Sequence, residues 1–570
     1  MASPTRFALV LLLLVAPVLA GDEAPADERL DRAKVEIRDH EYRAAERIFR
    51  EILREDPTNR RAHLGLARCL RGVGEHPAAA AIYDALIELD PTDPRPHVAL
   101  GLLAIYIDRK AEARRHCETA LRHDPEHAPA LAAMARVEIE QKKYSAAHRL
   151  LVKAEKIEPD RESVLSARSE YRFRTKDMGA AVRLIRRILE LNPRAIEAHI
   201  RLARGFIEPG RPYWKPPEVP LAYATAVYSA VRKYRALDLD GAEAAFRTLD
   251  GPESPDARPA FHLGLIALRR GKVRIAIAHL WRALDREPEN FLVRNALGVA
   301  YRNRIRAQRA EHGGGPGGVD RLRPLIASLP APAVKDIDRF VRGYRRLLPE
   351  ERRVVLRAVA PLASFLPVLI RTGIRHDVLG FEEGMCDAKE RQWIRDRRTL
   401  DGRWYGALRG VGGRHAATGI EAIREAGAFD YDTFAHEFAH QVHRFALSAE
   451  QKRVIEHLYS LAKKDDLCLD YYAASNHMEY FAQGYEAFVS VVKSPFHHSL
   501  RRHTRAELAD RDPGLYEFIR KLTGTPDPDP ALVAVAPGVL RFYEWAGDGI
   551  ELSRAKELFG PLTPAAAEPK

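Results

Sequence analysis

Five prolines recur at a fixed interval in the first part of the chain. Each lies 34 residues after the previous one, and an alanine stands twelve residues before each proline. The prolines are Pro57, Pro91, Pro125, Pro159 and Pro193, and the alanines are Ala45, Ala79, Ala113, Ala147 and Ala181. A period of this length is typical of a repeated pair of helices. In such a pair the proline ends the second helix, and the small alanine lets two helices approach closely.

The repeats resemble tetratricopeptide repeats. That family has leucine followed by glycine or alanine in its first helix, alanine and an aromatic residue in its second helix, and a terminal proline. The matching residues are LGLA at 64–67, ALGL at 99–102, Ala79 with Tyr83, and Ala45 with Phe49. The resemblance implies a mainly α protein that begins with an α-solenoid over residues 26–308. Its concave face would bind a protein partner, although the repeats could instead serve only as a spacer.

The repeat pattern is interrupted once and then resumes. The segment EPGRPYWKPPEVP (208–220) is too rich in proline for a helix and is expected to form an inserted loop. The later markers are Ala242, Phe246 and Pro255 in a degenerate unit, and Ala276, Ala283 and Pro288 in a clear one. We expect roughly seven or eight units, with a capping helix after Asn290. The run HGGGPGG (312–318) then indicates a flexible linker, placed at residues 309–333.

The first twenty residues have the composition of a cleaved signal peptide. Arg6 precedes the apolar run FALVLLLLVAPVLA, and the small residues Val18 and Ala20 stand before Gly21. A membrane anchor is the less favoured alternative, because a span needs about 20 apolar residues. The most apolar later segment, 354–370, is interrupted by an arginine and two prolines. We therefore expect a signal peptide at 1–20 and a periplasmic or extracellular protein without a stable membrane span.

The charge and the cysteines narrow the possible functions. The net charge is +12, from 91 Lys and Arg against 79 Asp and Glu, and basic and acidic residues alternate along the predicted helices. This distribution argues against a nucleic-acid partner. The four cysteines form no CxxC pair. Cys69 and Cys117 are expected to be buried in the repeats, whereas Cys386 and Cys468 could form a disulfide in an oxidising compartment.

The segment DTFAHEFAHQVHRF, which starts at Asp432, contains an HExxH motif. Residues four apart lie on one face of a helix, so His436 and His440 can bind one tetrahedral ion. Glu437 can then reach a water at the metal. Asp432 or Thr433 would cap this helix, and its apolar residues are expected to be buried. Burying these polar groups without partners would cost a few kcal/mol, which favours a zinc site.

The third zinc ligand must come from elsewhere in the chain. The metzincin pattern does not fit, because the positions it requires hold His443 and Ala446. His443 lies about 10 Å along the helix from His436, so we expect it to pack beside the ligands, with ligation a remote alternative. A later segment, YYAASNHMEYFAQGYEAFVSVV (471–492), places Glu479, Gln483 and Glu486 on one helical face.

Together with HEFAH, the sequence EYFAQGYEAF is similar to the ExFAExF element of the anthrax lethal factor-like metallopeptidases, a gluzincin group. The resemblance implies that Glu479 is the third zinc ligand and that Tyr472 stabilises the oxyanion. Tyr471 and Tyr480 are alternatives to Tyr472. The second Glu of the family element is Gln483 here, whose carbonyl would accept a hydrogen bond from a ligand histidine. Glu486 would support the site in the same way, cap a helix or remain solvated.

These residues predict a zinc metallopeptidase domain over residues 334–560, mostly helical with a small β-sheet, and a disordered tail at 561–570. Zinc held by His436, His440 and Glu479 would lower the pKa of a bound water towards ~7. Glu437 would take the proton, and Tyr472 or His477 would stabilise the oxyanion. The peptide or protein substrate would pair with an edge strand at GALRGVGG (406–413), unless this stretch is a plain hairpin.

Two other functions remain open from the sequence. The chain could be a non-catalytic scaffold in which the repeats act and the zinc site is structural or degenerate. It could also be a zinc hydrolase that cleaves bonds other than peptide bonds, because the same ligands would serve.

Overall fold

The computed structural model describes residues 26–106, 109–203, 214, 217–310, 331–399, 403–427, 431–470, 472–490, 493 and 504–524. The predicted signal peptide, the tail, and most of the predicted linker and inserted loop lie outside the described residues. The described chain is mainly helical and includes a solenoid of helix pairs and a four-stranded sheet, which confirms the predicted fold class. It divides into two compact units, Met1–Ala198 with Tyr301–Gly313 and His199–Ala300 with Gly314–Lys570.

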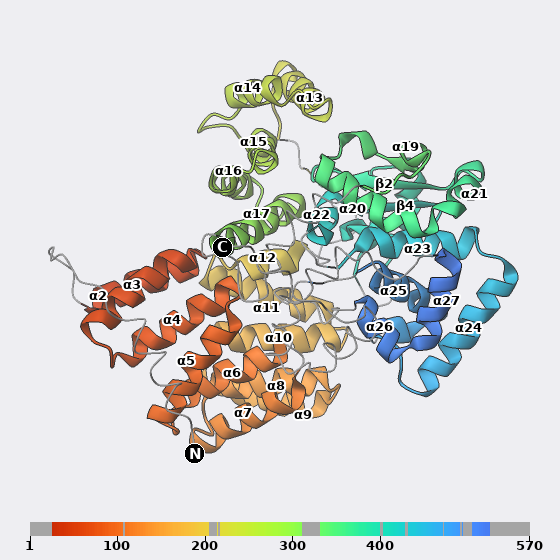
Figure 1. Cartoon of the computed structure of the whole chain (residues 1–570). Coiled ribbons are helices and arrows are strands. Elements are labelled where there is room, and N and C mark those ends of the chain that lie inside the picture. Colours follow the sequence, from red (N-terminus) through yellow and green to blue (C-terminus); the bar gives the residue numbers. More distant parts are fainter. Residues whose placement is uncertain are drawn as a thin grey trace, which may run out of the picture. The chain divides into compact units, whose positions relative to one another are not determined.

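The first unit contains the regular repeats (Figure 1). Its helices are α2 (Ala26–Arg38), α3 (Tyr42–Glu55), α4 (Arg60–Val73), α5 (His76–Leu89), α6 (Pro94–Tyr106), α7 (Lys110–His123), α8 (Ala128–Glu140), α9 (Tyr144–Ile157), α10 (Glu162–Arg174) and α11 (Met178–Leu191). Helices α3, α5, α7, α9 and α11 each end two residues before one of the periodic prolines. The period therefore sets where the second helix of every pair stops.

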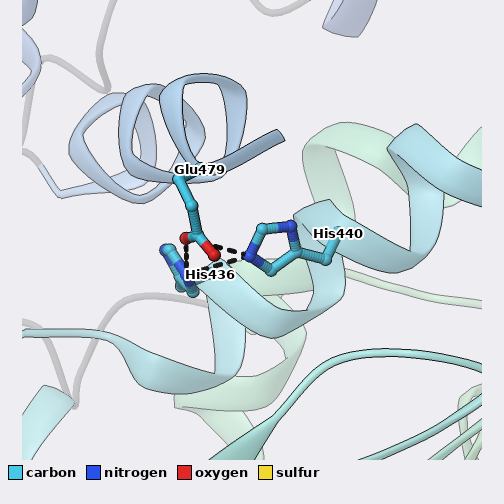
Figure 2. A group of neighbouring side chains, drawn as sticks. All are labelled: His436, His440 and Glu479. Atoms are coloured by element: carbon cyan, nitrogen blue, oxygen red, sulfur yellow. Dashed lines mark hydrogen bonds and ion pairs between the residues drawn. The ribbon is translucent and has the colours of Figure 1, made fainter. Parts of the chain in front are cut away.

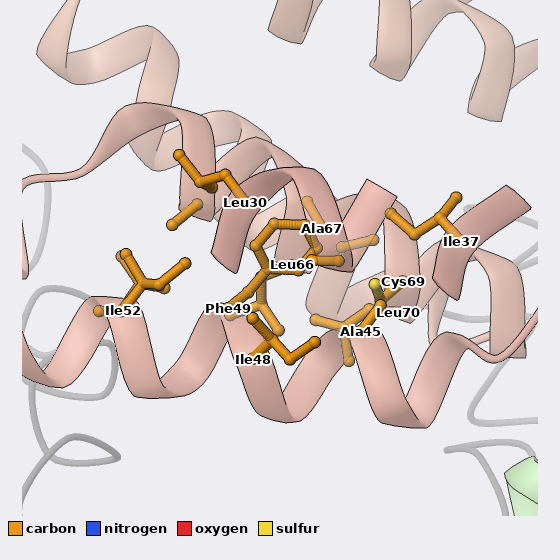
Figure 3. Packing of buried hydrophobic residues seen from close by; sticks show 14 of the residues in the cluster. Leu30, Ile37, Ala45, Ile48, Phe49, Ile52, Leu66, Ala67, Cys69 and Leu70 are labelled. Carbon is orange, nitrogen blue, oxygen red and sulfur yellow. The ribbon is translucent and has the colours of Figure 1, made fainter. Parts of the chain in front are cut away.

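Close approach of neighbouring helices explains the periodic alanines, all five of which are completely buried. Figure 3 shows this packing in the first repeats, where Phe49 of α3 lies against α4. A side chain at Gly65 would overlap the Phe49 ring. Cys69 and Cys117 are buried and free, as expected for small residues in these interfaces.

The second unit begins with two further helix pairs. These are α13 (Leu221–Arg235), α14 (Leu239–Leu249), α15 (Ala257–Arg269) and α16 (Val273–Arg286), followed by α17 (Phe291–Ala310). Ala242, Phe246, Ala276 and Ala283 are completely buried, as the degenerate and clear repeat units predict. Asn290 caps α17, because its Oδ1 accepts a hydrogen bond from the Leu292 amide at 3.0 Å. Helices α12 (Ile196–Ala203) and α17 each cross the boundary between the two units.

The rest of the second unit contains a small sheet (Figure 1). Its strands are β1 (Val341–Arg342), β2 (Arg375–Leu379), β3 (Gly410–Val411) and β4 (His415–Gly419), in the order β1-β2-β4-β3. β1 and β4 are parallel to β2, and β3 pairs antiparallel with β4. The longer helices are α20 (Pro349–Val359), α23 (Thr433–Phe445), α24 (Ala449–Lys464), α25 (His477–Val489) and α27 (Pro513–Thr523). Shorter helical elements include α19 (Ile337–Phe340), α21 (Leu366–Arg371), α22 (Ile420–Ala426), α26 (Arg505–Arg511) and the 3-10 turn η5 (Ala473–Ser475).

Within this unit, the last repeat helix contacts the part of the chain that carries the HExxH motif. Asn295 of α17 donates a hydrogen bond to Glu421 of α22, with 2.8 Å between Nδ2 and Oε1. Glu421 is buried and also pairs with Arg409, the residue that precedes β3. Residues 199–300 thus contribute contacts to the fold around the motif. Functional measurements should therefore use the full chain.

One described segment, Pro349–Arg371, is long and apolar enough to cross a membrane by composition alone. It is not a single continuous helix, because Leu362 has a non-helical backbone between α20 and α21. Val355, Leu362 and Leu369 are completely buried inside the unit. A third of its most apolar window is buried in the described chain. That its arginine and prolines argue against a span stays a prediction.

The possible disulfide between Cys386 and Cys468 is not formed in the structure, where both residues are buried thiols. Cys386 packs with Leu379, Met385 and Ile394 in a small apolar cluster beside the sheet. Its role is that of a small core residue.

Candidate metal centre

Helix α23 carries the HExxH motif and starts where the sequence provides a cap. Asp432 is the N-cap residue, and its Oδ1 accepts a hydrogen bond from the Ala435 amide at 2.9 Å. Phe434, Phe438 and Val442 are completely buried and hold the helix in the core. The hydrogen bond identifies Asp432, rather than Thr433, as the cap. The buried apolar residues fix which face of α23 carries His436 and His440.

Helix α25 packs against α23 and presents Glu479 in its first turn. Its N-cap is Asn476, whose Oδ1 accepts hydrogen bonds from the amides of Met478 and Glu479, both at 3.0 Å. Tyr480 and Phe481 are buried behind this turn. The cap fixes the backbone of Glu479, so its side chain leaves the helix toward α23.

His436, His440 and Glu479 converge on one point (Figure 2). The Nε2 atoms of His436 and His440 are 3.1 Å apart, and Glu479 Oε2 lies 3.2 Å and 3.3 Å from them. Neighbouring donor atoms in a tetrahedral zinc site with bonds of about 2.0–2.1 Å are about 3.3 Å apart. The three residues therefore fit a zinc ion in both donor chemistry and spacing. Among the described residues, they are the one group of three His, Cys, Asp or Glu side chains with this convergence.

The charges within the triad favour a bound cation. Burial alone would raise the pKa of Glu479, but the neighbouring His436 and His440 outweigh it and lower the pKa below the ordinary value. Burial also lowers the pKa of His440, and Glu479 more than offsets that effect, so the pKa is raised. Glu479 is therefore ionised at neutral pH, as a zinc ligand must be.

Glu437 lies next to the triad and against the edge of the sheet. A Cβ on Gly410 would lie 3.2 Å from its Oε1, and one on Gly412 would lie 3.0 Å from its Oε2. The glycines of the GALRGVGG stretch thus allow the backbone of the β3 segment to approach this carboxyl group closely. Burial raises the pKa of Glu437 to about 7, with His440 opposing the shift and Glu479 adding to it. A carboxyl group with such a pKa is suited to accept and return a proton near neutral pH.

Two tyrosines flank His436. The Tyr472 ring centroid lies 6.4 Å from that of His436. The ring centroid of Tyr431, in the segment before α23, lies 5.8 Å from that of His436. Tyr480 is turned elsewhere, because its buried hydroxyl donates a hydrogen bond to Asp512. Tyr471 lies outside the described residues. The role of Tyr472 in stabilising the oxyanion therefore stays a prediction. Tyr431 is a neighbour of His436 that the sequence did not indicate.

Gln483 does not contact a ligand histidine as the family resemblance implied. Its Oε1 accepts a hydrogen bond from the Tyr431 hydroxyl at 2.6 Å, and its Nε2 donates to Asp470 Oδ2 at 3.1 Å. The expectation was wrong, because the amide oxygen and nitrogen bond to Tyr431 and Asp470 instead of to a histidine. Gln483 is completely buried within this network.

Glu486 is completely buried, so it is not a solvated residue. Its Oε1 accepts a hydrogen bond from the Asp432 amide at 2.9 Å, and its Oε2 lies 2.6 Å from Lys493 Nζ. It thereby ties the start of α23 to α25. Lys493 lies seven residues after Glu486, beyond the end of α25, and the sequence alone did not indicate this pair.

His443 and His477 form a separate cluster beside the triad. The His443 ring is buried and lies 5.6 Å from the rings of His477 and Phe481, so it packs as expected. Burial lowers the pKa of His443 to about 4, and the neighbouring His477 and His440 add to this shift. His477 Nε2 lies 3.9 Å from Glu456 Oε1. These contacts place His477 with Glu456 and His443, so its part in stabilising the oxyanion stays a prediction.

A buried hydrogen-bond network fixes α23 to the sheet. His376 of β2 contacts Gln441 Oε1 through Nδ1 at 3.1 Å and Thr418 Oγ1 through Nε2 at 2.9 Å. Gln441 follows His440 directly, and its Nε2 donates to the carbonyls of Arg375 and Gly413. These hydrogen bonds hold α23, and with it His440, in position relative to β2 and β4.

This network predicts an acid-sensitive fold. Burial lowers the pKa of His376 to about 4. As the pH falls from about 6.5 toward 4, the unfolded chain binds a proton that the folded chain does not, so the free energy of unfolding decreases. The loss reaches about 2 kcal/mol at about pH 5. Urea midpoints measured at neutral pH and at about pH 5 should show this decrease, and His376→Gln should reduce it.

The matched control is His457→Gln on the exposed face of α24. It should leave the difference between the two urea midpoints unchanged. An equal pH dependence in wild type and His376→Gln would show that other groups cause the acid sensitivity.

Comparison with family models identifies the helix pairs. Residues 36–103 and 109–171 match one tetratricopeptide repeat model, and residues 261–312 match a second. The helix pairs within these three ranges are tetratricopeptide repeats. The matches cover parts of the predicted solenoid, and the last one runs to residue 312, past the predicted end of the solenoid at 308. They do not include the HExxH motif.

Some of the solved structures similar to parts of the chain are also tetratricopeptide repeat proteins. One, from Thermus thermophilus, is 22% identical, covers 31% of this chain and 96% of its own, and has a TM-score of 0.28. Another, from Parabacteroides merdae, is 14% identical, covers 48% of this chain and 98% of its own, and has a TM-score of 0.22. Comparison with curated proteins gave no match.

Proposed function

We propose that the chain is a zinc-dependent peptidase whose tetratricopeptide repeats bind its protein substrate. The main support is the convergence of His436 Nε2, His440 Nε2 and Glu479 Oε2 within 3.1–3.3 Å, from two helices, next to Glu437. When bound, zinc would activate a water molecule and polarise a carbonyl group. Two imidazoles and one carboxylate leave a fourth position for that chemistry.

The other roles fall to residues of the chain itself. Glu437 accepts a proton from the attacking water and passes it to the nitrogen of the leaving amine. Burial raises the pKa of Glu437. A cation held by the neighbouring triad would oppose that rise and favour the ionised form of Glu437. Tyr472 donates a hydrogen bond to the carbonyl oxygen as negative charge develops there.

Strand β3 provides a place for the substrate. It stands at the end of the described sheet, where its outer edge can pair with an extended peptide. Gly410 and Gly412 bring the backbone of this segment against Glu437. A peptide paired with β3 would therefore hold a carbonyl group near the general base.

The remaining parts of the proposal rest on the sequence. The apolar segment at 1–20 supports export to the periplasm or the exterior. The repeats support a protein partner on their concave face, because solenoids commonly present extended binding surfaces.

The test is cleavage of a peptide library by the purified full chain, with products read by mass spectrometry. We expect cleavage that is lost on chelation and restored by zinc. Cleavage that survives complete zinc removal would contradict the zinc mechanism. Hydrolysis confined to esters or other bonds would identify a different zinc hydrolase. Binding of proteins without any hydrolysis would support the scaffold.

A further inference from the structure

We propose that Gln483 positions Tyr431 and Tyr472 beside His436, and that this position requires an amide side chain. The inference rests on the proposed peptidase function, because positioning is measured through catalysis. It assigns a role to the residue at which the chain departs from the ExFAExF element. The role differs from that of a hydrogen-bond acceptor for a ligand histidine.

Gln483 joins two segments that are far apart in the sequence. It lies one turn after Glu479 on α25 and is completely buried. Its Oε1 accepts a hydrogen bond from the Tyr431 hydroxyl at 2.6 Å. Its Nε2 donates to Asp470 Oδ2 at 3.1 Å. One amide therefore connects the segment before α23 with the segment before η5.

Asp470 extends this connection to Tyr472. Its Oδ1 accepts hydrogen bonds from the backbone amides of Tyr472 at 2.9 Å and Ala473 at 2.7 Å. These bonds fix the turn from which the Tyr472 side chain projects. The Tyr472 and Tyr431 rings lie 6.4 Å and 5.8 Å from the His436 ring. A change at Gln483 should therefore move both tyrosines relative to the ligand helix.

The direction of the hydrogen bonds explains the need for an amide. Asp470 acts as an acceptor at both oxygens, so the group that faces it must be a donor. The Tyr431 hydroxyl donates, so the group that faces it must be an acceptor. Glutamine meets both conditions at once. An ionised glutamate would set two carboxylates against each other and remove the donor, which is unfavourable in a buried site.

The experiment compares four full-length variants with the wild type: Gln483→Glu, Asp470→Asn, the double variant, and Gln451→Glu. In the double variant, the new asparagine can donate to the new glutamate through Nδ2 while its Oδ1 still accepts from Tyr472. Gln451→Glu is the matched control, because Gln451 lies in a capping box at the surface that glutamate also satisfies. For each protein, kcat and KM, zinc content and the melting temperature are measured.

We expect Gln483→Glu to lower kcat by about 10–100-fold with little change in KM, while zinc stays stoichiometric. Its melting temperature should fall by several degrees. Adding Asp470→Asn should restore most of the lost kcat and most of the lost stability. The control should match the wild type in all four measurements.

Three results would overturn the proposal. The first is an unchanged kcat in Gln483→Glu. The second is a double variant that recovers its melting temperature but not its kcat, since the network would then be structural only. The third is a loss of zinc in parallel with kcat, which would place the effect at the metal. If the wild type cleaves nothing, the proposed function fails together with the positioning role. The melting temperatures still report separately whether the hydrogen-bond network exists.

Discussion

Glu479→Ala is expected to abolish zinc binding and peptide cleavage together. Glu479 supplies the one carboxylate of the triad, 3.2–3.3 Å from both imidazoles. Without it, two histidines on one helix remain, and we expect zinc affinity to fall by more than about 100-fold. Metal analysis after dialysis against a defined zinc concentration measures the loss. Chelation should lower the melting temperature of the wild type and leave that of Glu479→Ala unchanged, since only a protein that binds zinc is stabilised by it.

The control for this experiment is Glu450→Ala, at an exposed position in the first turn of α24. It removes the same side chain without touching the triad and should keep the zinc content of the wild type. Stoichiometric zinc in Glu479→Ala would show that this carboxylate is not a ligand. The proposed hydrolytic chemistry would then have no basis in this triad.

The repeats could be predicted from the sequence because their structure is local. Pro57 and Pro91 mark helix ends two residues earlier, at Glu55 and Leu89, and the same relation holds for Pro125, Pro159 and Pro193. Ala45 and Ala79 are buried because every pair repeats the same close contact. A short-range pattern that recurs five times leaves few alternative folds.

The candidate site could be predicted only in part. The spacing of His436 and His440 and the cap at Asp432 depend on one helix, so they follow from the sequence. Glu479 was proposed through a family resemblance, and the structure brings it to the two histidines. The expected contact of Gln483 was wrong, because its partners come from segments whose packing the motif does not specify.

Residues that support the site from a distance were not found from the sequence. His376 lies on β2, 65 positions before Gln441, and no local pattern connects the two residues. Tyr431 stands just before the helix cap, and its contact with Gln483 depends on how α23 and α25 pack. Tertiary packing determines such pairs, so a single sequence carries little signal for them.

The compact units also differ from the domains expected from the sequence. A change in composition near residue 312 suggested a linker between the repeats and the peptidase domain. The structure groups residues 199–300 with the HExxH part, through contacts such as Asn295 with Glu421. Composition reports where a chain is flexible, whereas compactness depends on which surfaces pack together.

Glu437→Gln should separate metal binding from catalysis. Glutamine has nearly the same shape and can keep the close approach to Gly410 and Gly412, so the fold and the zinc content should be retained. It cannot accept a proton, and we expect kcat to fall by about 10²–10⁴-fold. Steady-state kinetics on the best library peptide, together with metal analysis of the same samples, measure both effects.

Glu517→Gln is the matched control, because Glu517 is partly exposed on α27 and pairs with Arg520 away from the triad. Its kcat should equal that of the wild type. If Glu437→Gln keeps both its zinc and its kcat, another group must take the proton from water. The pKa of about 7 at Glu437 would then reflect only its burial beside β3. If kcat falls while zinc is retained, proton transfer by Glu437 is the simplest cause, because the metal ligands and the fold are unchanged.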